Sequence, residues 1–167
     1  NAETAPDSAL SAALARSIAA VPAFCVVTQT LPPEHIARVI RGAQIFGDTR
    51  KVLNYMALSP CGTRLVYSAR AGFLEGSTAD KARRIAAAFE ARFPATRGVA
   101  VDFFWSGRFA ITADLIPHVG AGDRVHWMIG CCGTGITMSS YLGHKIARRI
   151  LGADDAGTVF GLPLPPM

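Results

Sequence analysis

The hydrophobic positions in the last third of the chain predict a strand, a glycine turn and a long helix. Residues 125–129 form a short apolar run rich in β-forming side chains. The turn, residues 130–135, reads Gly-Cys-Cys-Gly-Thr-Gly. Apolar side chains then recur at helical spacing as far as Gly152, and they are Ile136, Met138, Tyr141, Leu142, Ile146, Ala147, Ile150 and Leu151. We therefore expect the glycines to lie between a buried strand and a helix.

Shorter elements alternate irregularly along the earlier part of the chain. The predicted strands are residues 24–30, 52–58, 64–69, 99–112 and 116–119, with a bulge or a close backbone approach at Gly107. The predicted helices are one ending near Ile18, one opened by Pro33, and one between a capping box at residues 77–80 and Pro94. Because hairpins occur among the helices, we predict an α+β fold: a largely antiparallel mixed sheet flanked by helices, ending in the strand, glycine turn and long helix.

Composition limits the classes of function. Of the 167 residues 50% are apolar and 17% are charged, which is typical of a globular domain. No apolar run approaches the roughly 20 residues that a membrane-spanning helix needs. The net charge of +5 raises the question of nucleic acid, but the basic residues are scattered and no nucleic-acid motif accompanies them. We therefore predict neither a nucleic-acid partner nor a membrane span.

The four cysteines show neither a C-x-x-C pair nor a zinc spacing, so we predict no metal site. Cys131 and Cys132 are adjacent in the glycine turn. They are interpreted either as a redox pair or as small, reduced core residues of a cytoplasmic protein.

The glycine turn itself has two interpretations. A turn that opens a helix leaves backbone N–H groups without intrahelical partners at the positive end of the helix dipole. Because glycine has no Cβ, an electron-rich group such as a phosphate, a carboxylate or the edge of a carbonyl-bearing ring can come close. The alternative is an ordinary packing turn that needs positive φ. The G-x-G-x-x-G dinucleotide fingerprint is not found in the sequence.

Three groups of residues, in this order along the chain, resemble one enzyme family. The first is a hairpin segment containing Asp48-Thr49, Leu53-Asn54-Tyr55, Pro60-Cys61-Gly62, Leu65 and Arg70. The second contains Trp105-Ser106-Gly107-Arg108, Thr112-Ala113-Asp114 and Pro117-His118-Val119-Gly120, and it is similar to W-x-G…T-P-D-x-x-P-x-I-G. The third is the glycine turn followed by Gly143, which is similar to a late G-x-x-G-x-G segment.

Together these groups resemble the C-terminal part of FAD-dependent D-amino-acid-oxidase-like enzymes. The nearest branch is that of gamma-glutamylputrescine oxidoreductase, beside the sarcosine and glycine oxidases. The resemblance implies oxidation of an amine or amino acid by hydride transfer to FAD, which a missing N-terminal domain mainly binds. It divides the chain into residues 1–20 (the end of that domain or a frayed helix), 21–152 (a substrate-binding domain with the glycine turn) and 153–167 (an extended tail rich in proline).

The resemblance also implies roles for particular residues. The cofactor-binding candidates lie in and after the turn, and they are Gly130, Cys132, Gly133, Thr134, Gly135 and Ile136, with backbone N–H groups of residues 133–135 facing the flavin. The substrate-binding candidates are Arg70 and Arg108, which can bind a carboxylate, and Tyr55 and Trp105, which can wall an apolar pocket. Structural ion pairs for the arginines and core packing for the aromatic residues remain the alternatives. Asp114 is interpreted as a turn or cap residue, and no general base is identified.

Departures from the family pattern affect the shape of the site. Ala113 stands where the family has proline, and Leu115 where glycine is common. Gly107 falls where sarcosine oxidases carry a flavin-linking cysteine, so no covalent flavin bond is expected there.

Two rival functions remain open, a stand-alone ligand-binding module and a module that docks another domain without redox activity. As part of an oxidase, the isolated chain is expected to be inactive and without FAD. It is also expected to expose an apolar face toward the missing domain, through which it can form a homodimer.

Overall fold

The chain forms two compact units in a computed structural model that describes residues 9–41, 45–49, 54–70, 76–122 and 124–165. The first unit consists of Asn1–Val21 and Arg108–Met167, and the second of Pro22–Gly107. Both passages between the units lie within strands, β1 (Ala19–Thr28) and β5 (Val101–Ile111). The second unit is therefore one continuous segment inserted into the sequence of the first.

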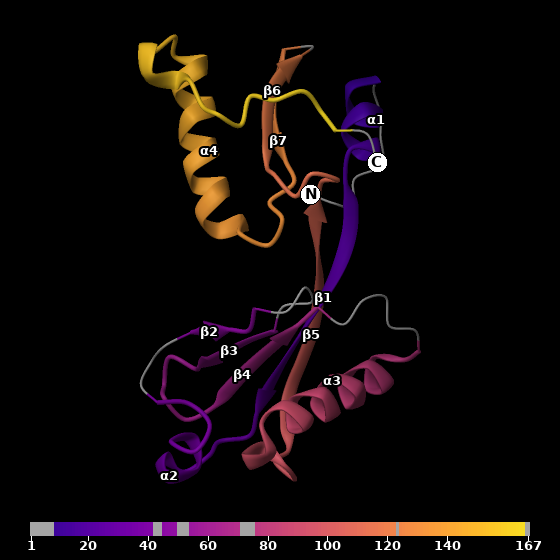
Figure 1. Cartoon of the computed structure of the whole chain (residues 1–167), viewed down its shortest axis with the longest axis vertical. Helices are drawn as coiled ribbons and strands as arrows, with labels where there is room; N and C mark the ends of the chain where they lie inside the picture. Colours follow the sequence, from indigo (N-terminus) through magenta and orange to yellow (C-terminus); the bar gives the residue numbers. More distant parts are fainter. Residues whose placement is uncertain (1–8, 42–44, 50–53, 71–75, 123, 166–167) are drawn as a thin grey trace. The chain divides into compact units, whose positions relative to one another are not determined.

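A five-stranded antiparallel sheet, in the order β2-β3-β4-β1-β5, organises the second unit (Figure 1). Its other strands are β2 (Phe46–Gly47), β3 (Asn54–Leu58) and β4 (Leu65–Ala69). Strands β3 and β4 form the predicted hairpin, with Leu58 opposite Leu65 and Asn54 opposite Ala69. The predicted start of this hairpin, residues 52–53, lies outside the described residues. The α+β class predicted from the sequence is confirmed.

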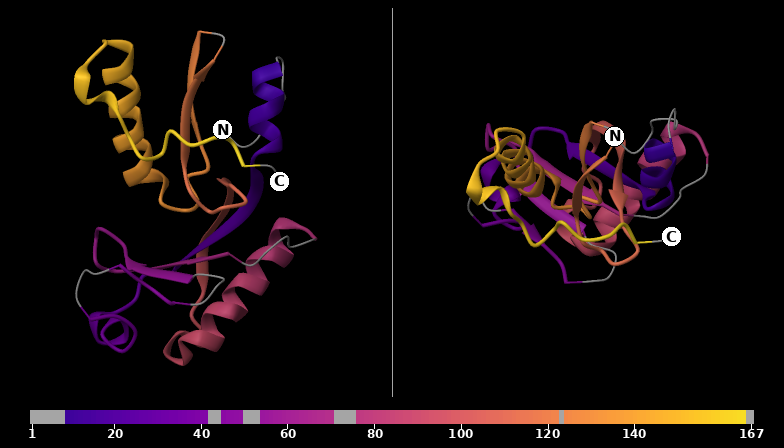
Figure 2. Two further views of the ribbon diagram at one scale, coloured as in Figure 1. Left: turned by 45° about the horizontal axis from the view of Figure 1, so that its top comes forward. Right: turned by 90° about the horizontal axis from the view of Figure 1, so that it is seen from above.

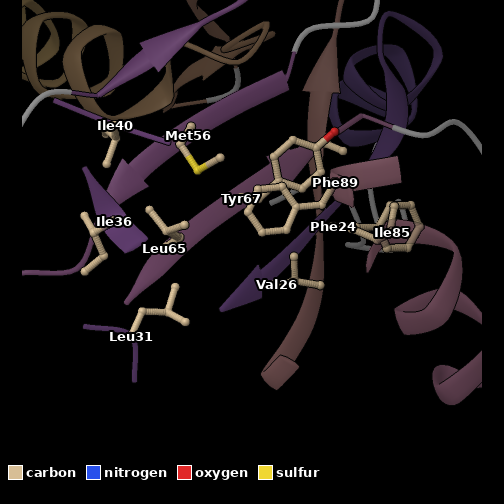
Figure 3. Close-up of a cluster of buried hydrophobic side chains, with 11 residues drawn as sticks. Phe24, Val26, Leu31, Ile36, Ile40, Met56, Leu65, Tyr67, Ile85 and Phe89 are labelled. Carbon is tan, nitrogen blue, oxygen red and sulfur yellow. The ribbon is translucent and has the colours of Figure 1, made fainter. Parts of the chain in front are cut away.

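Helix α3 (Thr78–Arg92) packs against one face of this sheet (Figure 3). It begins at the predicted capping box, in which the Ser77 hydroxyl accepts from Asp80 N–H and the Asp80 carboxylate accepts from Ser77 N–H. On its buried side, the Phe89 ring stacks on Tyr67 of β4 with centroids 4.8 Å apart. The Tyr67 hydroxyl donates to Asn54 Oδ1 over 2.6 Å, so this polar tip is satisfied inside the core.

Helix α2 (Pro33–Ile36) is shorter than the predicted helix. Beyond it, the N–H groups of Arg38 and Val39 donate three residues back, so the helix tightens into turns. Ile36 and Ile40 still face the core, as their spacing predicts. The glycine expected to end this helix, Gly42, lies outside the described residues.

The hairpin tip between β3 and β4 carries an exposed cysteine. Cys61 Sγ lies 3.2 Å from Ser59 Oγ and 3.1 Å from Thr63 Oγ1. Hydrogen bonds from Ser59 and then Thr63 stabilise the thiolate and lower the pKa of Cys61 to about 7. Cys25, on β1, behaves oppositely, because burial raises the pKa of its thiol to about 11.

In the first unit, a two-stranded hairpin lies between two helices (Figure 2). The hairpin strands are β6 (His118–Gly122) and β7 (Val125–Ile129), with Gly120 opposite Trp127. Helix α1 (Ala9–Arg16) lies on one side, and helix α4 (Gly135–Ile150) on the other. The C-terminal segment then passes the hairpin, where Val119 N–H donates to Phe160 O over 2.9 Å. No helix among the described residues is both long and apolar enough to cross a membrane.

Three local predictions were wrong. Strand β5 runs through Ser106 and Gly107 without a break, and a Cβ at Gly107 would have no neighbour within 4 Å. Strand β1 begins before Pro22 instead of after it, since the φ of proline is compatible with an extended chain. Strand β6 continues to Gly122, so the hairpin turn comes later than predicted, and Arg124 has a φ of 60° there.

Candidate functional site

The glycine turn between β7 and α4 has an unusual backbone. Three of its residues have positive φ: Gly130 at 70°, Cys132 at 49° and Gly133 at 93°. Positive φ in a residue with a Cβ is strained, and such strain gathers at functional sites. Hydrogen bonds hold the turn, because Cys132 N–H donates to Ala110 O (3.1 Å) on β5 and Thr134 N–H donates to Cys131 O (2.8 Å).

Helix α4 begins with open backbone donors. Its first intrahelical bond runs from Met138 N–H to Thr134 O, and no side chain caps it. Within the described part of the chain, the N–H groups of Gly135, Ile136 and Thr137 therefore have no acceptor. The Ile136 side chain is 92% exposed, so it does not close this end of the helix.

This arrangement changes one detail of the predicted site. We expected N–H groups of residues 133–135 to be the donors, but Thr134 N–H is already bonded within the turn. The Thr134 hydroxyl also donates to Cys131 O over 2.9 Å. Among the described residues, the expected donors Gly133 and Gly135 have no acceptor, and Ile136 and Thr137 at the start of α4 add two more unpaired N–H groups.

Thr112 packs against the glycine turn at Gly130 and Cys132. Its side chain is fully buried, and its hydroxyl donates to Ile116 O over 2.8 Å. The same oxygen lies 3.5 Å from Cys132 Sγ. A Cβ on Gly130 would come within 2.4 Å of Thr112 Cγ2, so glycine is required where the turn passes this side chain.

Asp114 and His118 add further polar contacts next to Thr112 and Ile116. Asp114 Oδ1 accepts from Ile116 N–H (3.1 Å), which is the turn role that the sequence predicts. His118 is 1% exposed, with Nε2 3.0 Å from Asp114 Oδ2 and Nδ1 3.3 Å from Leu162 O. Desolvation raises the pKa of Asp114, but the hydrogen bond from Ile116 N–H and the nearby Thr112 hydroxyl and His118 ring outweigh it and lower that pKa below its ordinary value.

A second candidate surface is the face of the sheet opposite α3, in the second unit. Strand alternation buries Asn54 and Met56 and leaves Tyr55 between them 37% exposed on this other face. On β5, Phe104 stacks near the core residue Phe24, so its neighbour Trp105 points away from the core and is 50% exposed. The structure thus places two of the predicted substrate contacts on one face.

The two arginines are placed differently. Arg70 directly follows β4, and by strand alternation it continues the row of Ser68, which lies opposite Tyr55. Arg108 belongs to the first unit, as do the cofactor-binding candidates, whereas Tyr55, Arg70 and Trp105 belong to the second. Neither arginine is without an interaction partner.

Sequence comparison identifies the family. Residues 4–149 match the family described as FAD dependent oxidoreductase (DAO), which is most of the chain. The chain belongs to this family. The resemblance noted from the motifs is therefore confirmed.

Individual relatives support the same family. The chain is 26% identical over 152 residues to the probable oxidoreductase OrdL of Haemophilus influenzae, covering 90% of the chain and 34% of OrdL. It is 28% identical over 129 residues to gamma-glutamylputrescine oxidoreductase of Escherichia coli, covering 76% of the chain and 30% of that enzyme. The chain thus spans about a third of the length of these curated relatives.

Solved structures share the fold. Glycine oxidase from Geobacillus kaustophilus superposes with a TM-score of 0.66 at 19% identity, covering 95% of the chain and 41% of the oxidase. The start of α4, within this shared fold, offers unpaired N–H donors that can bind an electron-rich group.

His118 is the site residue that the sequence reasoning missed. Its signal was a single ionisable side chain inside the apolar run of residues 116–119, four residues after Asp114. In the structure it links that carboxylate to the C-terminal segment.

Proposed function

We propose that this chain is the substrate-binding and flavin-closing part of an FAD-dependent enzyme that oxidises an amine or an amino acid. The open, uncapped start of α4 carries the proposal, because it offers hydrogen-bond donors in a chain that belongs to an FAD-dependent family. The relatives named for gamma-glutamylputrescine and glycine support an amine or amino acid as the substrate class.

The residues of the turn fit the edge of a flavin ring. When bound, FAD supplies an acceptor for a hydride from the carbon beside the substrate nitrogen, leaving an imine that water can hydrolyse. The N–H groups of Gly135, Ile136 and Thr137 would donate to the ring edge where negative charge develops on reduction. The positive end of the α4 dipole would add to this stabilisation. Gly130, Cys132 and Gly133 would shape the turn and keep side chains clear of the ring.

The open sheet face would contribute the substrate contacts. Tyr55 and Trp105, both part-exposed on that face, would provide apolar walls. Arg70, at the end of β4, is the candidate on this face to bind a substrate carboxylate through paired N–H donors. Arg108, which belongs to the first unit, is a separate candidate for the same role. We assign no general base, and no step is proposed for the cysteines, which are all free.

We further propose that most FAD contacts come from a dinucleotide-binding domain outside this sequence. Large apolar side chains would then be covered by that domain, and Val159 (79% exposed) and Leu115 (65% exposed) are examples. The chain expressed alone should show no flavin absorption band and no oxidase activity. A homodimer in sedimentation experiments would mean that a second copy can cover the same side chains.

A charge placed at Ile136 tests the central claim in the full-length protein. Because Ile136 is 92% exposed at the start of α4, Ile136→Asp should leave the fold intact, and aspartate favours this end of a helix. The carboxylate would nevertheless repel the negative charge of the reduced flavin. We expect Ile136→Asp to lower the two-electron midpoint potential of the flavin, and the matched neutral variant Ile136→Asn to change it much less.

Two results would contradict the proposal. An equal potential for Ile136→Asp and Ile136→Asn would mean that the start of α4 does not face the flavin. Full-length protein that never binds FAD would favour the rival function, a docking module without redox activity.

A further inference from the structure

We propose that His118 is a positioning residue for the flavin-facing turn, acting through Asp114 and Thr112. This inference rests on the proposed function, because it assumes that the start of α4 meets the flavin. It adds a role for a buried imidazole and for the C-terminal segment, residues 158–162.

The first step is the fixed position of the His118 ring. Its side chain is 1% exposed, so the ring has little room to turn. Its two nitrogens face different acceptors: Nε2 faces Asp114 Oδ2 at 3.0 Å, and Nδ1 faces Leu162 O at 3.3 Å. A ring nitrogen that carries a hydrogen therefore donates toward one of these acceptors, which no aliphatic side chain of similar size could do.

The second step leads from Asp114 to the glycine turn. Asp114 accepts a hydrogen bond from Ile116 N–H, and the carbonyl of the same Ile116 accepts from Thr112, which fixes the segment around the Thr112 hydroxyl. The Thr112 hydroxyl donates to Ile116 O and lies near Cys132 Sγ, and the Thr112 methyl group packs close to the backbone of Gly130. Every link from His118 to the turn is thus a contact between neighbouring side chains or a short turn of backbone.

The third step connects the C-terminal segment to the same support. Phe160 O accepts from Val119 N–H, next to His118, and the Phe160 ring packs edge-on against Tyr141 of α4 with centroids 6.4 Å apart. Leu162 O completes the contact with His118. Residues 158–162 therefore link β6 to α4. His118 links this C-terminal segment to Asp114.

By fixing the backbone donors at the start of α4, His118 would stabilise the negative charge of the reduced flavin. Backbone donors stabilise developing charge only when their directions are fixed in advance. If His118 no longer holds Asp114, the donors at Gly135, Ile136 and Thr137 should lose part of that fixed direction. The expected result is weaker preference for reduced over oxidised flavin, without loss of any group that contacts the ring.

Three variants of the full-length protein separate the two nitrogens. His118→Gln can place an amide N–H near the Nε2 position and keep the Asp114 bond. His118→Asn can place one near the Nδ1 position and keep only the Leu162 bond, and His118→Phe keeps the ring volume but neither bond. Val119→Ala is the matched control, because Val119 is a buried neighbour (5% exposed) whose side chain lies outside the polar chain.

We expect His118→Phe and His118→Asn to reduce the relative affinity for reduced flavin about tenfold, which is about 30 mV for a two-electron couple. His118→Gln should retain most of the wild-type potential, and Val119→Ala should retain it fully while unfolding at a lower temperature. In the flavin-free full-length protein, amide exchange at residues 130–137 should be faster in His118→Asn than in His118→Gln. This exchange measurement decides the question if His118→Phe does not fold.

Equal potentials in wild type, His118→Gln and His118→Asn, with equal exchange rates at residues 130–137, would overturn the inference. So would a shift in Val119→Ala as large as that in His118→Asn. The Ile136→Asp variant distinguishes the two proposals. If it shifts the potential while the His118 variants do not, only the role of His118 is wrong, and if it shifts nothing, the flavin-facing turn is wrong as well.

Discussion

Gly130→Ala is the substitution whose effect can be worked out most directly from the structure. The residue has a φ of 70°, which costs about 1–2 kcal/mol for a side chain with a Cβ. The new methyl group would also lie 2.4 Å from Thr112 Cγ2 and 3.3 Å from Ile116 O. Thr112 cannot move aside easily, because it is fully buried, β-branched and bonded to Ile116 O.

Overpacking of this kind costs a further 1–3 kcal/mol or so, which brings the expected total to about 2–5 kcal/mol. Urea unfolding of the full-length protein measures it. Gly152→Ala isolates the backbone contribution, because Gly152 has a φ of 68° but a Cβ there would have no neighbour within 4 Å. Gly143→Ala, inside α4 and in open space, should instead stabilise the helix by about 0.5–1 kcal/mol.

The contact between Gly130 and Thr112 can be tested separately from the backbone strain at Gly130. If Gly130→Ala destabilises the protein no more than Gly152→Ala, Thr112 does not support the turn as described. A Gly130→Ala variant that unfolds normally but fails to bind FAD would show instead that the turn is shaped for its ligand.

Further predictions concern single side chains. Folding lowers the pKa of Asp114, so its contribution to stability is full well above the ordinary pKa of an aspartate and is lost as the pH falls through the lower folded pKa. The stability gap between wild type and Asp114→Asn should therefore close in acid, and a gap independent of pH would contradict this. Cys61, with its pKa of about 7, should react with iodoacetamide at neutral pH well before Cys25. Peptide mass analysis measures the labelling, and equal labelling of the two cysteines would refute this prediction. Tyr67→Phe should lower the free energy of unfolding by about 0.5–1.5 kcal/mol, since it removes the buried hydrogen bond to Asn54, and an unchanged unfolding midpoint would count against that bond.

Elements with strong local signals were predictable from the sequence. The capping box at Ser77 and Asp80 opens α3 as expected, because its hydrogen bonds form within four residues. Alternation along β3 predicted that Asn54 and Met56 would share one face. The helix after the glycine turn was also predictable, since its apolar positions repeat with the helical period over residues 136–151.

Features that depend on distant parts of the chain were not predictable. Gly107 looked like a break in a strand, yet β5 continues through it as the edge strand beside β1, because the sheet and not the local residue determines the course of the strand. Nothing local indicated that the His118 ring would reach Leu162, 44 residues later. The donors at α4 were predicted approximately, and only the backbone geometry showed that Thr134 N–H was already bonded.

The insertion of Pro22–Gly107 into the sequence of the first unit has a consequence for how the protein folds. During synthesis, the second unit is complete before most of the first unit has been made, so it can fold while α1 still lacks its later partners. The first unit must then close a loop over the whole insertion, which makes its contact order high and its folding comparatively slow. A mutation that slows folding of the inserted sheet should therefore also delay the appearance of the flavin-facing turn, although the residues involved belong to another unit.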